Sequence, residues 1–421
     1  MAIPFKPADI LLPDFSRYTG TPWSCVACDQ YTSQPEYWEG ADAAAADAPS
    51  TLRLIIPEVY LSETDARKPA VLAAMEDYLR DVLVEHPHSM ILVERTLRNG
   101  ATRWGLMGMV DLMTYDYRKG ADSLIRATEA TVAERIPART TIRRDAPVEL
   151  PHVMMLIDDR HRTVIEPLTQ AKATLPLAYD HDLMQSSGHL KGYLLTPDLM
   201  EQVETALAAL ITPEAMEERY GREGLAPLLF AVGDGNHSLA AAKTCFEELR
   251  AAMGDEAAME HPARYALCEV VNLYDDSLQF EPIYRVVFGV EPRDLLASFE
   301  AYIGALQGDA APQHLVWASN GLTGALTVPA PVAALTVGTV QDFLDEYMKT
   351  APAGAYVDYI HGRNPTVALA NRPDAIGFLF DGMAKEELFS TVISDGALPR
   401  KTFSMGHAED KRFYTEVRRI K

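Results

Sequence analysis

Cysteine is scarce in this chain, with four residues in 421. So few cysteines do not make a disulfide framework, which excludes the small disulfide-rich secreted classes. Cys25 and Cys28 form a Cys-x-x-Cys pair, a spacing used by redox pairs and by half-sites for zinc. Cys245 and Cys268 form no second pair, and a structural zinc site takes four ligands. We therefore interpret the pair as a chance spacing in a strand or turn, with redox or metal use as the alternative.

The chain also has few long apolar runs and few positively charged residues. No run approaches the ~20 apolar residues of a membrane span, and the opening Met-Ala-Ile-Pro-Phe-Lys lacks the apolar core of a signal peptide. Lysine and arginine number 38 against 60 aspartates and glutamates, so the net charge is −22. The electrostatic field of a protein with this negative charge repels nucleic-acid backbones and anionic membranes. We expect a cytoplasmic protein that binds a small molecule, with neither nucleic acid nor a membrane as a partner.

What the chain does have is an alternation of strand-like and helix-like periods. It predicts a strand over 52–60, a helix over 65–85, and two strands over 90–96 and 103–112 joined by a turn at Asn99-Gly100. Prolines interrupt residues 1–50, which are expected to be irregular. The alternation predicts a mixed α/β (α+β) fold. The length favours two or three domains, and we place them at 1–150 (α/β), 151–290 (a central module) and 291–421 (α/β).

One junction combines a strand, glycines, polar residues and a helix start. An apolar run from Pro227 to Val232 ends in Gly233-Asp-Gly-Asn-His237, and a good helix former follows. The first N–H groups of such a helix attract anions, and glycine allows the backbone to approach a ligand closely. Two interpretations stay open: a phosphate or nucleotide site, or a tight structural turn with Asp234 or Asn236 as N-cap.

The binding interpretation assigns a role to each residue of this junction. His237 is the candidate acid, base or phosphate contact, and Asp234 the candidate ligand of Mg²⁺ or of the acceptor hydroxyl. These two are the predicted catalytic residues, with Asp234 as the metal ligand. The predicted phosphate cradle consists of Gly233, Gly235, Asn236 and Ser238.

Positive charge for such a site has several possible sources. Segment 118–144 is a basic island that could clamp a phosphate or carboxylate, or form a surface neutralised by Asp122, Glu129 and Glu134. Arg285 lies in an apolar run, so it needs a partner, either a carboxylate such as Asp234 or a bound anion. The island comprises Arg118, Lys119, Arg126, Arg135, Arg139, Arg143 and Arg144; the predicted cofactor contacts among all cations are Arg126, Lys243 and Arg285.

Two further polar segments leave alternatives open. The stretch from Cys28 to Pro35 is either a ligand-facing loop or a structural turn with an Asx cap. Segment 398–414 carries many charges, and it either closes a pocket or forms a charged rim.

Several motifs together resemble the bacterial family called domain of unknown function 1015. They are Ser123-Leu-Ile-Arg-Ala-Thr-Glu129, Gly233-Asp-Gly-Asn-His237, Pro282-Ile-Tyr-Arg-Val286, Asp358-Tyr-Ile-His-Gly362 and Pro399-Arg-Lys-Thr-Phe-Ser-Met-Gly-His-Ala-Glu-Asp-Lys411. The resemblance covers essentially the whole chain. That family brings no assigned activity with it, so the resemblance implies kinship more than function.

The junction also resembles the turn of the ParB/sulfiredoxin superfamily, where members carry Asp-Gly-His-His-Arg. A helix over 196–211 and a strand over 227–232 precede it in the same order. The resemblance implies a ParB/sulfiredoxin-like module over 151–290 and a nucleotide-binding turn, and one branch contains an ADP- or ATP-dependent kinase of free serine. This chain departs from the pentad at Asn236 and at Ser238, which removes a titratable base and a phosphate-binding cation.

These observations predict a nucleotide-dependent phosphotransferase or hydrolase that acts on a small polar metabolite, with ATP or ADP and Mg²⁺ as cofactors. The alternative is a non-catalytic nucleotide or metabolite sensor. A ParB-like DNA-binding protein is disfavoured by the net charge of −22.

Overall fold

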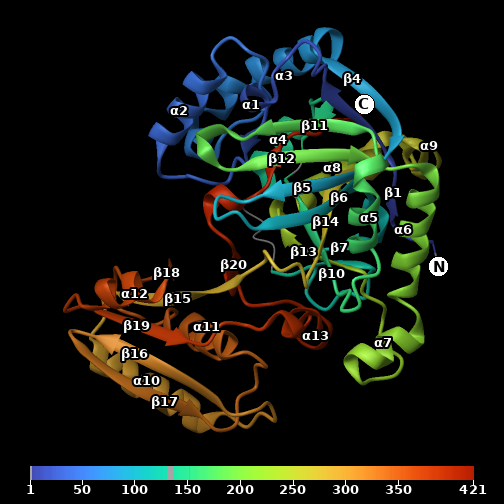
Figure 1. Cartoon of the computed structure of the whole chain (residues 1–421). Helices are drawn as coiled ribbons and strands as arrows, with labels where there is room; N and C mark the ends of the chain where they lie inside the picture. Colours follow the sequence, from blue (N-terminus) through green and yellow to red (C-terminus); the bar gives the residue numbers. More distant parts are fainter. Residues whose placement is uncertain (1, 130–135, 151) are drawn as a thin grey trace. The chain divides into compact units, whose positions relative to one another are not determined.

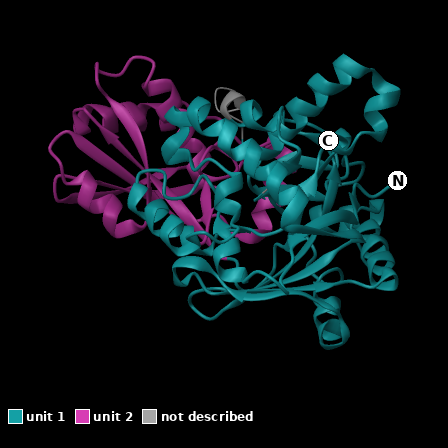
Figure 2. Cartoon of the chain, turned by 90° about the horizontal axis from the view of Figure 1, so that it is seen from above, with its two compact units in different colours: residues 1–278, 407–421 teal, residues 279–406 magenta. Residues whose placement is uncertain are grey.

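The computed structural model describes residues 2–129, 136–150 and 152–421, and these form two compact units. Unit 1 comprises residues 1–278 and 407–421, and unit 2 comprises residues 279–406 (Figure 2). The chain therefore leaves unit 1, builds unit 2, and returns. The three-part division at 150 and 290 stays a prediction.

Unit 1 is built on a ten-stranded mixed sheet, which bears out the mixed α/β fold class. Its order is β11-β12-β5-β6-β14-β10-β13-β8-β7, with β1 pairing β6 (Figure 1). The strands near the site are β5 (Ile91–Thr96), β6 (Thr102–Asp111), β8 (Ile125–Ala127), β10 (Met154–Ile157), β13 (Phe230–Asp234) and β14 (Tyr265–Asn272). The others are β1 (Phe5–Lys6), β7 (Tyr115–Asp116), β11 (Leu177–Asp182) and β12 (His189–Leu194).

Both faces of this sheet are covered, because alternate side chains of a strand point to opposite faces. Leu92 and Leu106 pack with α6 (Pro197–Ala209) and α8 (Asn236–Met253). Val93 and Met107 pack on the other face with Trp38 of α2 (Pro35–Ala45) and with β2 (Ala8–Pro13). The strands are thus apolar on both sides, which is why they read as continuous apolar runs.

The C-terminal tail (residues 407–421) completes unit 1. Its strand β21 (Phe413–Tyr414) pairs β3 (Cys25–Val26), and β22 (Arg418–Arg419) pairs β9 (Val148–Glu149). Buried Arg95 and Arg103 donate to the carbonyls of Glu409 and Asp410, each at 2.9 Å. The tail is therefore held by main-chain pairing and by buried arginines.

Unit 2 is an antiparallel sheet of order β17-β16-β19-β15-β18, with β20 (Phe403–Met405) pairing the start of β15. Phe299 of α10 stacks on Phe343 of α11 and meets Phe378 edge-on, and this aromatic cluster forms its core. The strands are β15 (Phe280–Phe288), β16 (Gln313–Ser319), β17 (Leu322–Val328), β18 (Tyr356–His361) and β19 (Ala375–Phe380). The helices are α10 (Pro292–Ala305), α11 (Thr336–Tyr347), α12 (Arg363–Ala370) and α13 (Lys385–Asp395).

Three local predictions are wrong. The expected strand over 52–60 consists of the 3₁₀ turns η1 (Thr51–Leu54) and η2 (Glu58–Glu63), because the Ser50 side chain accepts the Leu52 N–H and Pro57 separates the turns. The helix α3 (Thr64–Asp81) ends early, and β4 (Leu83–Ser89) follows it. Residues 8–13 are not irregular, since β2 pairs β4. Among the described residues, no helix combines the length and apolar character needed to cross a bilayer.

Candidate functional site

The turn at residues 233–238 joins β13 to α8 as predicted. Gly235 is the N-cap of α8 at φ 80°, and no side chain caps the helix. A Cβ at Gly235 would lie 3.0 Å from the Val153 Cα, so both the positive φ and the close approach require glycine. The alternative N-caps, Asp234 and Asn236, are wrong. The N–H groups of the first turn of α8 thus receive no capping side chain.

Asp234 meets a cation from the C-terminal tail. Its Oδ1 accepts the Gly235 N–H at 2.9 Å, and its Oδ2 lies 3.4 Å from the Lys411 Nζ. Both side chains are largely buried, with 19% of Asp234 and 14% of Lys411 exposed. His237 follows in the first turn of α8 and is half-buried. Lys411 therefore supplies a positive charge beside the turn, where the sequence resemblance implied one was missing.

Asn236 carries an unsatisfied acceptor. Its Nδ2 donates to the Thr128 Oγ1 at 3.3 Å and to the Val232 carbonyl at 3.4 Å. Because a carbonyl only accepts, this contact fixes which end of the amide is the nitrogen. The Asn236 Oδ1 is buried, and within the described part of the chain it has no hydrogen-bond partner. A ligand hydroxyl or amine would satisfy it.

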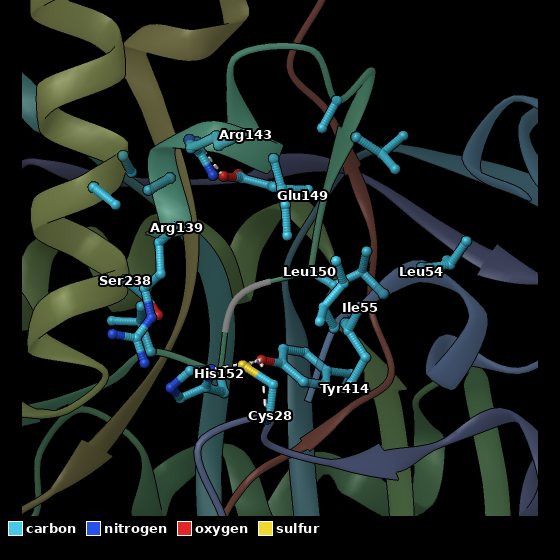
Figure 3. Close-up of a pocket in the computed structure, with 18 of the residues that line it drawn as sticks. Cys28, Leu54, Ile55, Arg139, Arg143, Glu149, Leu150, His152, Ser238 and Tyr414 are labelled. Atoms are coloured by element: carbon cyan, nitrogen blue, oxygen red, sulfur yellow. Dashed lines mark hydrogen bonds and ion pairs between the residues drawn. The ribbon is translucent and has the colours of Figure 1, made fainter. Parts of the chain in front are cut away.

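A histidine network adjoins the turn. The His152 Nε2 lies 3.2 Å from the Asp29 Oδ2, and its Nδ1 lies 2.8 Å from the Tyr414 hydroxyl. That hydroxyl donates to the Cys28 Sγ at 3.1 Å (Figure 3). The Arg139 Nη2 lies 3.9 Å from the Asp29 Oδ2, and Arg139 forms an ion pair with Glu58. His152 immediately precedes Val153, the residue against which Gly235 packs, so the network and the turn are neighbours.

The electrostatics favour the charged forms of both His152 and Asp29. Burial opposes the charge on His152, but the Asp29 carboxylate outweighs it, and with help from Asp234 the pKa of His152 is raised. Burial also opposes the charge on Asp29, yet His152 holds the pKa of that carboxyl well below its usual range. Burial, with Asp29, raises the pKa of Cys28 to about 12. Burial also raises the pKa of Cys25 to about 12. Both cysteines are free thiols and poor nucleophiles.

A cavity of about 460 Å³ opens beside this network, between η1 and η2, α4 (Ile136–Arg143) and α8. One part of its wall is polar, and Ser238 from the turn belongs to it (Figure 3). The remainder is apolar. The polar wall consists of Cys28, Glu58, Arg139, Arg143, Glu149, His152, Ser238 and Tyr414, and the apolar wall of Leu54, Ile55, Ile56, Leu61, Met75, Ile142, Ala146, Val148, Leu150, Val153, Leu239, Ala241, Ala242 and Ala266.

The described arginines of the basic island lie in three kinds of place. Those at its ends form ion pairs at the surface, as the surface interpretation predicted, with Asp116 and Glu248, and Arg126 binds main-chain carbonyls. Glu134, one of the expected acidic partners, lies outside the described residues. Arg139 and Arg143 instead line the cavity. Arg135 lies outside the described residues. The exposed pairs are Arg118–Asp116 and Arg144–Glu248.

The three predicted cofactor cations bind main-chain carbonyls. Arg126 donates to Ser123 at 2.9 Å and to Ala226 at 3.1 Å. Lys243 donates to Leu112 at 3.0 Å. Arg285 lies in unit 2, where it donates to the Arg400 carbonyl at 2.7 Å, to the Lys401 carbonyl at 3.0 Å and to the Gln341 side chain at 3.1 Å. Their roles as ligand contacts stay predictions.

Sequence reasoning found only part of this site. Asp29 lies in the polar loop that was held open as ligand-facing, and Lys411 ends the last family motif. His152, Glu58 and Tyr414 were missed, because each stands alone in its segment and no spacing links them. Among the described residues, no group of three or more His, Cys, Asp or Glu side chains is placed to hold a metal ion.

Comparison with known proteins gives one family match. The model of the family described as "Protein of unknown function (DUF1015)" matches residues 11–354. A search of the curated proteins found no match.

Solved structures give distant likenesses. A conserved hypothetical protein from Pyrococcus furiosus has a TM-score of 0.35 at 10% identity, covering 73% of this chain and 97% of its own. Free serine kinase in complex with AMP has a TM-score of 0.38 at 10% identity, covering 74% and 90%. SbnI with C-terminal truncation from Staphylococcus aureus has a TM-score of 0.34 at 11% identity, and the match covers 71% of this chain and 83% of SbnI. At these values the likenesses carry no conclusion about activity.

Proposed function

The chain belongs to this DUF1015 family, as the motifs predicted, and from the geometry of its site we propose a nucleotide-dependent phosphotransferase or hydrolase. ATP or ADP would be the nucleotide, and a small polar metabolite the acceptor, in the manner of a serine kinase. The partner is a small molecule in the cytoplasm, with neither nucleic acid nor a membrane involved.

One observation carries the proposal: an uncapped helix N-terminus, a buried lysine and a buried His–Asp pair converge where β13 ends. Asp234 is opposite Met154 in the sheet, and Gly235 packs on Val153, so α8 begins beside His152. The N–H groups of Asn236, His237 and Ser238 can cradle a phosphate. Lys411, which lies 3.4 Å from the Asp234 Oδ2, would supply positive charge to that phosphate.

The proposed chemistry divides between the turn and the histidine network. His237 contacts the phosphate or moves a proton, and Asp234 orients the acceptor hydroxyl. The unsatisfied Asn236 Oδ1 accepts a hydrogen bond from that hydroxyl or from the ribose. Both ring nitrogens of His152 are engaged, by Asp29 and by the Tyr414 hydroxyl, so His152 would act by holding these two groups in place beside the turn. Gly233, Gly235 and Ser238 give the turn its close approach to the ligand.

Mg²⁺ is compatible with this site only together with the nucleotide. Mg²⁺ commonly takes one or two carboxylates, and phosphate and water oxygens complete its shell. Asp234 offers such a carboxylate, although Lys411 competes for its Oδ2. The ion would neutralise charge on the transferring phosphoryl group.

A non-catalytic nucleotide or metabolite sensor is the second candidate. It is favoured by Asn236 and Ser238, which replace the base and the cation of the resembled pentad. It is also favoured by the Asp29 carboxylate, whose lowered pKa makes it a weak base.

The test has two stages. First, thermal unfolding is measured with AMP, ADP and ATP, each with and without Mg²⁺; no shift with any of them contradicts both candidates. Second, nucleotide hydrolysis and phosphate transfer to a panel of amino acids and sugars are assayed for the wild type and for His237→Ala. Turnover that His237→Ala lowers by about a hundredfold supports catalysis, whereas tight binding without turnover leaves only the sensor.

A further inference from the structure

The apolar part of the cavity is not explained by the proposed phosphate site. Ser238, Ala241 and Ala242 share one face of α8 and leave space toward Leu54, Ile55 and Met75. Protein interiors are close-packed, and large empty apolar voids are rare in them. A volume of about 460 Å³ falls in the range of about 300–1,000 Å³ found for small-molecule sites.

The wall does not suit a nucleobase. A purine edge carries several donors and acceptors, and burying them without partners costs free energy. The charged groups of the wall form ion pairs, Arg139 with Glu58 and Arg143 with Glu149, and these present charge rather than the set of donors and acceptors that a purine edge requires. An occupant with an apolar body needs no such partners, so it fits this wall better.

The polar end has an excess of positive charge. The Glu149 Oε2 lies 2.5 Å from the Arg143 Nη2, and the Glu149 Oε1 lies 2.7 Å from the Arg418 Nη2. A single carboxylate therefore faces two guanidinium groups. Arg139 and His152 are matched by Glu58 and Asp29. Arg139 and Arg143 both line the cavity, at 18% and 15% exposed, and Arg143 is the one that shares its carboxylate with a second guanidinium group, so it is the better placed of the two for an anion.

We propose that this cavity binds an amphipathic anion, with its charged group at Arg143 and its apolar body against Leu54, Met75, Ala241 and Ala242. This site is separate in its chemistry from the phosphate turn. It does not depend on nucleotide binding, so either proposal can fail alone.

Calorimetric titration of the full chain with decanoate, decanol and decylammonium tests the proposal, with each probe kept below its aggregation concentration. Decanoate is expected to bind at one site per chain, decanol about tenfold more weakly because it lacks the charge-assisted hydrogen bond, and decylammonium not at all. No saturable binding of decanoate, or equal binding of decylammonium, overturns the proposal.

Two variants locate the binding. Ala242→Phe fills the cavity and is expected to abolish decanoate binding, while the matched Ala251→Phe, at an exposed position of the same helix, leaves it unchanged. Arg143→Met retains the Arg418–Glu149 pair, so it does not strand a buried carboxylate. It is expected to lower decanoate binding to the level of decanol and to leave decanol unchanged. Unchanged decanoate binding in either Ala242→Phe or Arg143→Met refutes the assignment. If Ala242→Phe does not fold, Arg143→Met decides alone.

Discussion

Gly235 links the backbone of the turn to the neighbouring strand. Alanine there would have to adopt φ 80° and would place its Cβ 3.0 Å from the Val153 Cα. The left-handed conformation alone costs about 1–2 kcal/mol. Gly221→Ala is the matched control, since Gly221 has φ 65° and no atom within 4 Å of its Cβ position. We expect Gly235→Ala to lower the free energy of unfolding clearly more than Gly221→Ala, as measured by urea denaturation. Equal losses would show that contact with Val153 is unimportant.

The His152–Asp29 pair makes a pH-dependent contribution to stability. The pKa of His152 is raised above 6.5, so its contribution is full below that pH and is lost as the pH rises through the folded-state value. The pKa of Asp29 is lowered from 3.8, so its contribution is present above that pH and is lost in acid. The pair therefore stabilises unit 1 most between about pH 4 and about pH 6.5.

Asp29→Asn tests this coupling. Without the carboxylate, burial is expected to dominate and to move the pKa of His152 below 6.5. The ring titration of His152 is followed by NMR in both proteins, with His152→Gln to identify the resonance. We also expect the variant to lose about 1–3 kcal/mol of stability near pH 6, and less at pH 9. A titration unchanged by Asp29→Asn contradicts the ion pair.

At the scale of elements, Lys411 and Lys243 offer a direct comparison. Their side chains are 14% and 12% exposed, but Lys411 faces Asp234 at the start of α8, whereas Lys243 donates to the Leu112 carbonyl. We expect Lys411→Met to weaken ADP binding about tenfold or more, the loss of one charge-assisted contact. Lys243→Met should reduce stability and leave affinity for ADP unchanged. Isothermal titration measures both; the reverse ranking would restore Lys243 as the phosphate contact.

The elements were predictable where their signal is local. Apolar periodicity located β5, β6 and β13 to within a few residues, and glycine marked the turn. The pairing of β2 with β4 was missed, since it joins segments separated by about 70 residues and involves the proline-rich start of the chain. The network of Asp29, His152 and Tyr414 was not predicted for the same reason, because these three residues meet only through the fold.

At the scale of the whole molecule, unit 2 is an insertion into unit 1. Phe280 pairs with Met405 at the start of β15 and the end of the insertion. Paired residues of an antiparallel ladder have Cα atoms about 4.5–5.5 Å apart, so a short turn can join them. We expect a chain in which Gly-Gly replaces residues 281–404 to fold as unit 1 and to retain ADP binding, because a two-residue loop closes a hairpin. Circular dichroism, thermal unfolding and titration with ADP measure this.

Removal of the C-terminal tail is the control for the removal of unit 2, because the tail belongs to unit 1 and its loss is expected to unfold that unit. Deletion of residues 407–421 takes away Arg412 and Arg418, which pair with buried Glu269 at 2.8 Å and Glu149 at 2.7 Å. Glu149 keeps Arg143 as a partner, but Glu269 is left without Arg412, and leaving a buried charge without its partner costs about 3–5 kcal/mol. The deletion also removes the pairing of β21 with β3 and of β22 with β9, and together these losses are comparable to the stability of a typical domain. The tail-deleted chain is therefore expected to be unfolded, whereas the chain without unit 2 is folded. If the tail-deleted chain keeps a cooperative thermal transition, the tail does not complete unit 1. If the chain without unit 2 aggregates, unit 1 requires its insertion.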